Sequence, residues 1–179
     1  MKVLVFISCI TLGLFHSCAF MPSTRLQKEV STWINKPILF THDIDNLYAK
    51  DTSSVHYSLI YYVDSSICLT CRTSAWDNTI SEIEDSVGHS VFSILISSPK
   101  SDFLTNTQIH DIKFNRILWI DDQEEFQKIN HFSDKDLLHA FLLDSEHRVM
   151  VIGNPIASKS IEHLIIKRIR EIDSKKQTL

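Results

Sequence analysis

The chain has 179 residues, with 22 acidic and 18 basic side chains and a formal net charge of −4 at neutral pH. Its length suits a single domain with a real hydrophobic core. The mildly acidic, unclustered charge gives no support to nucleic-acid binding. Of its three glycines, only Gly88 and Gly153 follow the first twenty residues, which excludes a glycine-rich phosphate-binding loop and a nucleophile elbow.

Residues 1–18 predict an export signal. One positive charge precedes an unbroken run of apolar and small residues from Val3 to Phe15. This run has the length of the apolar region of a signal peptide and is too short to cross a membrane as a helix. A serine then precedes Cys18, which resembles the lipobox of bacterial lipoproteins and predicts a lipid on Cys18. Cleavage after Ala19 is the open alternative. Both alternatives predict a protein of the cell envelope, either periplasmic or anchored as a lipoprotein.

Export leaves two cysteines as available thiols. Cys9 would leave with the signal, and Cys18 would be lipidated or removed, so that Cys68 and Cys71 remain. Two cysteines this close make a poor structural staple, because the stabilisation by a disulfide grows with the loop that it closes. Outside the cytosol such a pair can be oxidised, which makes redox chemistry feasible.

Residues 19–55 predict an N-terminal extension of helix, strand and loop. A helix begins at Thr24 with the spacing of a capping box and ends before Pro37. A strand-like segment follows at 36–40, and the polar residues 41–54 predict a loop.

Residues 56–179 predict an α/β domain, in which apolar runs rich in aromatic and β-branched residues alternate with helical patterns. The predicted strands lie at 56–63, 90–98 and 116–120. Helices are predicted from the cysteines to Gly88, within 99–115, and at 124–132.

Residues 141–153 predict two antiparallel strands joined by a turn at Asp144–His147. A last helix follows, capped by Ser158 or Ser160, with cations that suit its C-terminal half. Its predicted buried stripe is Ile161, Leu164, Ile165, Ile169 and Ile172.

The two cysteines form a C-x-x-C motif between a predicted strand and a predicted helix. Cys68 follows the strand 56–63, and Cys71 lies in the opening turn of the helix. A helix N-terminus stabilises a thiolate and lowers the pKa of a cysteine there. A C-x-x-C motif beside a βαβ pattern indicates redox chemistry.

Between about Tyr57 and Ile172 the chain resembles the thioredoxin superfamily, and more closely the exported thioredoxin-like proteins of bacterial envelopes. The resemblance rests on IYYVDSSICLTC, on FLLDSEHRVMVIGNP and on the final helix. It implies a thioredoxin-like fold, with a central mixed β-sheet flanked by helices. It also implies a thiol–disulfide oxidoreductase without a cofactor, acting on protein thiols or disulfides, in which Cys68 attacks and Cys71 resolves the mixed disulfide.

The chain departs from the family pattern at three positions. Ile67 stands where thioredoxins usually have tryptophan before the first cysteine, and Tyr62 stands where they often have a buried acid. Leu138 stands where they have a cis-proline that exposes the neighbouring backbone to a substrate peptide. A cis bond to leucine would cost about 2.5–4 kcal/mol, so we expect none. Leu138 and His139 are the candidate substrate-binding residues, and we expect weak activity on unfolded proteins.

Two alternatives remain open. The chain could be a non-catalytic thioredoxin-fold module that binds a partner protein. It could also bind a soft metal ion through Cys68, Cys71 and His139, although a structural zinc site needs four ligands and no further ligand pair of suitable spacing occurs. We therefore assign no metal site. A peroxiredoxin is disfavoured, since its Pro-x-x-x-Thr-x-x-Cys pattern precedes neither cysteine.

Overall fold

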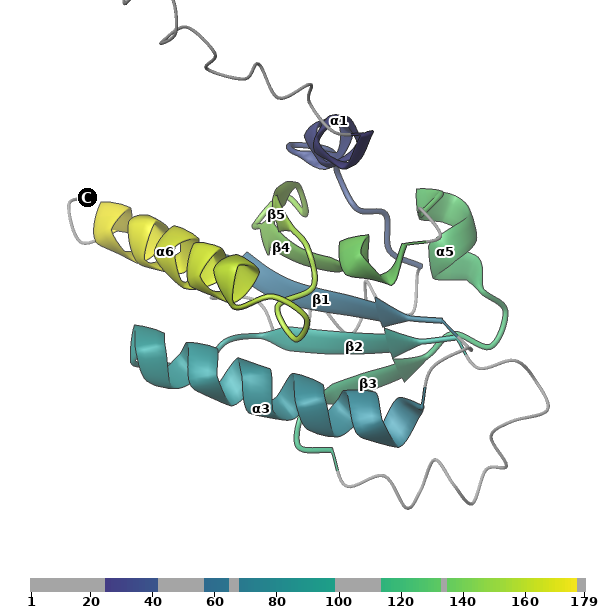
Figure 1. The fold of residues 1–179 in the computed structure, drawn as a ribbon, viewed down its shortest axis with the longest axis horizontal. Coiled ribbons are helices and arrows are strands. Elements are labelled where there is room, and N and C mark those ends of the chain that lie inside the picture. Colours follow the sequence, from purple (N-terminus) through teal and green to yellow (C-terminus); the bar gives the residue numbers. More distant parts are fainter. Residues whose placement is uncertain (1–24, 42–56, 65–67, 99–113, 133–134, 177–179) are drawn as a thin grey trace, which may run out of the picture.

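The computed structural model describes residues 25–41, 57–64, 68–98, 114–132 and 135–176 (Figure 1). The predicted signal at 1–18 and most of the predicted loop at 41–54 lie outside these residues. So does most of the segment 99–115, in which a helix was expected. Within the described ranges, no helix is both long enough and apolar enough to span a membrane.

A single sheet of five strands forms the centre of the fold. The strands are β1 (Tyr57–Val63), β2 (Ser93–Ser97), β3 (Ile117–Ile120), β4 (Ala140–Asp144) and β5 (Val149–Ile152). Their order in the sheet is β3-β2-β1-β4-β5. Strands β1, β2 and β3 run parallel, whereas β4 is antiparallel to both β1 and β5. The strands predicted at 56–63, 90–98 and 116–120 and the antiparallel hairpin at 141–153 are thus confirmed, and the sheet is mixed.

Helices cover both faces of this sheet. They are α1 (Arg25–Trp33), α3 (Leu69–Val87), α5 (Glu125–Asn130) and α6 (Lys159–Lys176), with a 3₁₀ turn η1 (Asp136–Leu138) before β4. Buried side chains of α3 and α6 pack on one face of the sheet, and those of α1 and α5 pack on the other. Figure 1 shows α3 and α6 next to each other. The predicted α/β fold of thioredoxin-like type, a mixed sheet flanked by helices, is confirmed.

Strand β1 divides the core into two layers, because successive side chains of a strand point to opposite faces. Leu59 and Tyr61 pack with the buried side chains of α3 and α6. Ile60 and Tyr62 pack with those of α1 and α5. All seven residues of β1 are buried, as expected for a central strand covered on both faces.

The structure differs from the predicted elements in two places. Residues 36–40 form a single antiparallel bridge, Pro37 to Arg148, instead of a strand, since proline has no N–H to extend the pairing. In α6, Leu164 is 46% exposed, whereas Ile166 is buried against the core. The predicted stripe was therefore wrong at Leu164, and Ile166 takes its place beside Ile165.

The start of α6 is set by Ser158. The Ser158 carbonyl accepts the backbone N–H of Glu162 at 3.1 Å, and its side-chain oxygen accepts that of Ile161 at 3.4 Å. These bonds satisfy donors that the first helical turn leaves without partners. Of the two predicted caps, Ser158 is the one that the structure uses.

Candidate functional site

The two cysteines lie at the start of α3, immediately after the chain leaves β1. Cys68 is the N-cap of the helix, and its sulfur accepts the backbone N–H of Cys71 at 3.4 Å. Its carbonyl accepts the N–H of Arg72 at 3.1 Å, which begins the helical hydrogen bonding. Both cysteines are exposed, and no disulfide joins them. Their predicted positions, before the helix and in its first turn, are confirmed.

The sulfur atoms of Cys68 and Cys71 lie 2.6 Å apart. This distance exceeds the length of a disulfide bond, about 2.05 Å, but is short enough for the pair to form a disulfide without moving the helix.

The surroundings favour Cys68 as the thiolate of the pair. Hydrogen bonds from the Cys71 thiol and then from the Cys71 backbone lower the pKa of Cys68. The pKa of Cys71 is raised, first because its thiol donates to Cys68 and then because the Cys68 sulfur repels a second negative charge. A proton shared between the two sulfurs thus resides mainly on Cys71.

The rest of α3 is fixed rigidly to the sheet. Trp76 is fully buried one turn after the cysteines, with its ring centroid 5.1 Å from that of Tyr61. On the outer side, Arg116 pairs with Asp77 and Glu84, each at 2.8 Å. The helix therefore holds the cysteines in a defined place at its exposed first turn.

A chain of polar contacts joins the start of α3 to three other parts of the fold. Arg72 Nη2 lies 3.2 Å from Asp136 Oδ2 in η1. The Tyr61 hydroxyl donates to Asp136 Oδ1 at 3.3 Å, and Asn154 Nδ2 donates to that hydroxyl at 3.1 Å. The Asn154 backbone N–H donates to the carbonyl of Leu137 at 2.9 Å. We call Arg72, Asp136, Tyr61 and Asn154 the Arg72 network.

Two members of the Arg72 network are buried, which makes their hydrogen bonds important. Tyr61 is fully buried, and Asn154 is 2% exposed. Burial, and then the negative charge of Asp136, raise the pKa of Tyr61 to about 12. Tyr61 therefore keeps its proton at neutral pH and acts as a hydrogen-bond donor to Asp136.

Gly153 sets the position of Asn154. Its φ of +140° is a conformation that other residues rarely adopt. A Cβ at this position would also lie 3.0 Å from the Ile161 side chain in α6. Only glycine lets the chain leave β5 along this path and bring Asn154 to Tyr61.

The structure places Leu138 and His139 away from solvent. They are 5% and 1% exposed, respectively. The His139 ring centroid lies 5.5 Å from that of Tyr62 and 6.0 Å from that of Phe132, on the α1 and α5 side of the sheet. The exposed residue of η1 is Leu137, at 53%. The structure thus brings Cys68 and Cys71 together and buries the two candidate substrate-binding residues in the core.

A group of three or more histidine, cysteine or carboxylate side chains that could hold a metal ion does not occur among the described residues. The site as described consists of the cysteine pair and the Arg72 network.

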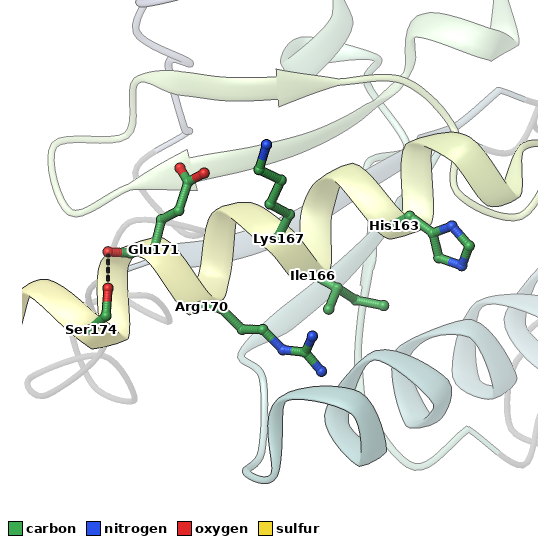
Figure 2. Close-up of a pocket in the computed structure, with 6 residues that line it drawn as sticks. All are labelled: His163, Ile166, Lys167, Arg170, Glu171 and Ser174. Atoms are coloured by element: carbon green, nitrogen blue, oxygen red, sulfur yellow. Dashed lines mark hydrogen bonds between the residues drawn. The ribbon is translucent and has the colours of Figure 1, made fainter.

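A second surface feature is a pocket of about 410 Å³ on α6. Figure 2 shows the residues that line it: His163, Ile166, Lys167, Arg170, Glu171 and Ser174. Arg170 extends toward α3 and donates a hydrogen bond to the carbonyl of Ser86. Because Ser86 lies in the last turn of α3, this pocket is at the opposite end of that helix from the cysteines.

Sequence reasoning missed the Arg72 network. One signal was available, since Arg72 directly follows the C-x-x-C motif and its charge acts on the neighbouring Cys71. Its partners could not be predicted, because 64 residues separate Arg72 from Asp136 and 93 separate Tyr61 from Asn154.

No family model matches this chain, and no curated protein matches it. Solved structures give remote likenesses. An uncharacterised conserved protein of Geobacillus kaustophilus matches with a TM-score of 0.42 and 11% identity, over 59% of this chain and 57% of that protein. A conserved protein of unknown function from Bacteroides fragilis matches with a TM-score of 0.42 and 15% identity, over 61% of this chain and 80% of that protein.

A thioredoxin-like protein from Bacteroides caccae matches with a TM-score of 0.40 and 15% identity, over 62% of this chain and 40% of that protein. Likenesses this remote indicate nothing about activity. The thioredoxin-like fold of this chain is instead evident in its own strand order and in the placement of its helices.

Proposed function

We propose that this chain is an exported thiol–disulfide oxidoreductase of the cell envelope, with Cys68 as the attacking sulfur and Cys71 as the resolving sulfur. The observation that carries the proposal is the pair of exposed cysteines at the start of α3, whose sulfurs lie 2.6 Å apart with no disulfide between them. The lowered pKa of Cys68 supports its role as nucleophile, because the thiolate is the reactive form.

The exchange proceeds in two displacements. The Cys68 thiolate attacks one sulfur of a partner disulfide, forms a mixed disulfide and releases the other partner sulfur as a thiolate, which takes up a proton. Cys71 then loses its proton and attacks the Cys68 sulfur. The Cys68–Cys71 disulfide forms, the mixed disulfide breaks, and the second partner sulfur leaves as a thiol. Two electrons pass from the cysteine pair to the partner, and the reverse sequence oxidises a partner dithiol.

The proposal also includes a location. We propose that residues 1–18 direct export and that a lipid on Cys18 attaches the protein to the membrane. The apolar run and the serine before Cys18 support this. Protein thiols or disulfides of the envelope would be the partners, without a cofactor and without nucleic acid. An exported domain would also meet the oxidising conditions under which a cysteine pair is used.

Substrate contact would occur at η1, beside the cysteines. Leu137 is the exposed residue of this turn. The buried side chains of Leu138 and His139 would contribute to substrate binding indirectly, by anchoring the turn to the core. The N–H groups of Leu138 and His139 donate within the turn, to Lys135 and Asp136 respectively. A 3₁₀ turn paired in this way is not an extended strand that could add a substrate peptide by β-pairing.

The second candidate function is a non-catalytic module that binds a partner protein or a metal ion. The internally paired η1 turn favours partner binding over peptide exchange, because it withholds main-chain groups from an extended substrate. Trapping distinguishes the two functions. The full chain with Cys71→Ser, incubated with an excess of a disulfide-containing peptide, should accumulate a mixed disulfide on Cys68, seen as an added mass.

Cys68→Ser is the matched control for this trapping experiment, since it retains the resolving sulfur and lacks the attacking one. It should accumulate much less adduct. An adduct that forms on Cys71 as readily as on Cys68, or on neither, would favour the non-catalytic module.

A further inference from the structure

The Arg72 network includes Arg72, which directly follows the cysteine pair. Its charged and polar side chains are partly or fully removed from water, which costs free energy that apolar side chains would not cost. Arg72 and Asp136 have side-chain exposures of 25% and 30%, so this ion pair is partly removed from water. The network also includes the polar groups of Tyr61 and Asn154, which are buried in the core. Burying polar groups is unfavourable unless every one is hydrogen-bonded. An arrangement of this kind next to a reactive group indicates a role in reactivity.

The position of Arg72 suggests what that role is. Arg72 directly follows Cys71 on α3, and its positive charge opposes the rise in the pKa of Cys71 that the Cys68 sulfur causes. An arginine side chain on a helical surface has several rotatable bonds and would otherwise extend into solvent. The contact with Asp136, supported by the Tyr61 hydroxyl, restricts it to one place.

We propose that Asp136 is a positioning residue of the thiol site, which holds the Arg72 guanidinium beside Cys71 so that its charge stabilises the resolving thiolate. The resolving role rests on the proposed function. The effect of Arg72 on the Cys71 sulfur does not, because it is a property of the reduced protein.

The charged and polar groups that act on Cys71, directly or through Arg72, come from three elements. On α3 they are the Cys68 sulfur and Arg72. Turn η1 contributes the Asp136 carboxylate, which contacts Arg72, and β1 contributes the neutral Tyr61 hydroxyl, which donates to Asp136. Cys68 opposes a negative charge on Cys71, and Arg72 favours it. Asp136 would oppose that charge if it acted directly and would favour it if it acts by holding Arg72.

These opposite signs make the proposal testable. The full chain with Cys68→Ser keeps Cys71 together with Cys9 and Cys18. The rate at which iodoacetamide alkylates Cys71 is therefore measured across pH by mass on the peptide that carries Cys71. Adding Arg72→Gln should slow alkylation at pH 7 by about threefold to tenfold, since a higher pKa reduces the thiolate fraction. Asp136→Asn should act in the same direction. The two changes together should have no more effect than Arg72→Gln alone.

Two further variants separate positioning from general disturbance. Arg72→Lys keeps the charge and should stay closer to the parent rate than Arg72→Gln. Glu146→Gln is a control that breaks a more exposed ion pair, with Arg148 in the β4–β5 turn. It should leave the alkylation rate of Cys71 unchanged. If Asp136→Asn does not fold, Tyr61→Phe removes the support of the carboxylate and should slow alkylation to a smaller extent.

Faster alkylation in Asp136→Asn would overturn the proposal, because it would mean that the carboxylate acts by its own charge. An unchanged rate, or additive effects of the two substitutions, would overturn it as well. The proposed function fails separately, if the wild-type pair cannot be reversibly oxidised. In that case the alkylation rates still report whether Asp136 acts through Arg72.

Discussion

Tyr61 and Tyr62 are neighbours in β1, and their hydroxyls serve opposite sides of the sheet. Tyr61 donates to Asp136 at 3.3 Å on the side of α3, whereas Tyr62 donates to Gln127 of α5 at 2.8 Å. Tyr62 is the position at which the family often has a buried acid, and here it packs against Phe126 and Phe132. A carboxylate contacts the cysteine-bearing turn instead from η1, where Asp136 pairs with Arg72.

The two cysteines should differ in reactivity in the wild-type protein. The pKa of Cys68 is lowered and that of Cys71 is raised, each mainly by the hydrogen bond between their sulfurs. Cys68 should therefore be alkylated faster, and its alkylation should persist to lower pH. Timed iodoacetamide labelling of the reduced protein, followed by peptide mass analysis, measures both rates. Equal and slow labelling of the two thiols would show that Cys68 is not activated.

Peptide disulfides in unfolded proteins should be poor substrates. The η1 turn uses its main-chain groups internally, and the Leu137 carbonyl already accepts the N–H of Asn154. We expect insulin to be reduced at least about tenfold more slowly than a small aromatic disulfide, because only the former needs main-chain pairing at this turn. Comparing initial rates with a common reductant tests this. Similar rates would mean that η1 opens to admit a peptide.

Trp76 should be the main anchor of the cysteine-bearing helix. It is fully buried between α3 and Tyr61, so Trp76→Ala should lower the free energy of unfolding by about 3–5 kcal/mol. Leu164→Ala is the control from the other helix on this face, because Leu164 is 46% exposed and should cost less than about 1 kcal/mol. Urea unfolding of both variants gives the comparison. A small loss in Trp76→Ala would show that the helix is held mainly by its polar contacts.

Acid should weaken the contact between Glu84 and Arg116. Burial acts to raise the pKa of Glu84, but hydrogen bonds from Arg116 and from the Val91 N–H outweigh it and lower the pKa. A pKa lowered on folding contributes stability above the unfolded value of about 4.3, and that contribution is lost as pH falls through the folded value. Glu84→Gln should therefore lower the urea midpoint at pH 6 and should differ less from wild type below pH 4.

Glu82→Gln provides the control for this pH dependence. Glu82 lies on the same helix and pairs with Lys159, but both side chains are more than half exposed. An exposed ion pair contributes little to stability, so the urea midpoint of this variant should match that of the wild type at both pH values. If the two variants behave alike, the effect of Glu84→Gln does not come from its partly buried contacts.

The start of the mature protein is open to direct measurement. We expect the chain purified from the envelope to begin at or next to Cys18 and to carry a lipid on Cys18, because a serine precedes Cys18 after the apolar run. Intact-mass analysis distinguishes the alternatives. Cleavage after Ala19 without lipid would contradict only the lipoprotein assignment, whereas retention of residues 1–17 would contradict export.

The fold was largely predictable because its signals are local. The apolar runs predicted all five strands, and the position of the turn at Asp144–His147 predicted the hairpin. Gly88 ends α3 in a left-handed conformation, as its place after the helical pattern indicated. The error at Leu164 arose because helical spacing alone does not show how α6 is rotated against α3. That rotation is set by packing of the two helices on the sheet.

The site was only half predictable. The C-x-x-C spacing and the following helical pattern were enough to place Cys68 at the N-cap of α3. The Arg72 network was not predictable, since it depends on a 3₁₀ turn and on the path that Gly153 allows. The same turn directs Leu138 and His139 into the core. Their role in substrate binding stays a prediction.

Redox titration of the full chain tests the central claim most directly. The protein is equilibrated in thiol–disulfide buffers of known potential, and the Cys68–Cys71 disulfide is counted by mass after the free thiols are alkylated. We predict one reversible two-electron transition with a midpoint between about −120 and −270 mV, the range of known exchange proteins. The Cys68→Ser variant should show no such transition. A wild-type pair that stays reduced, or stays oxidised, throughout this range would contradict the account.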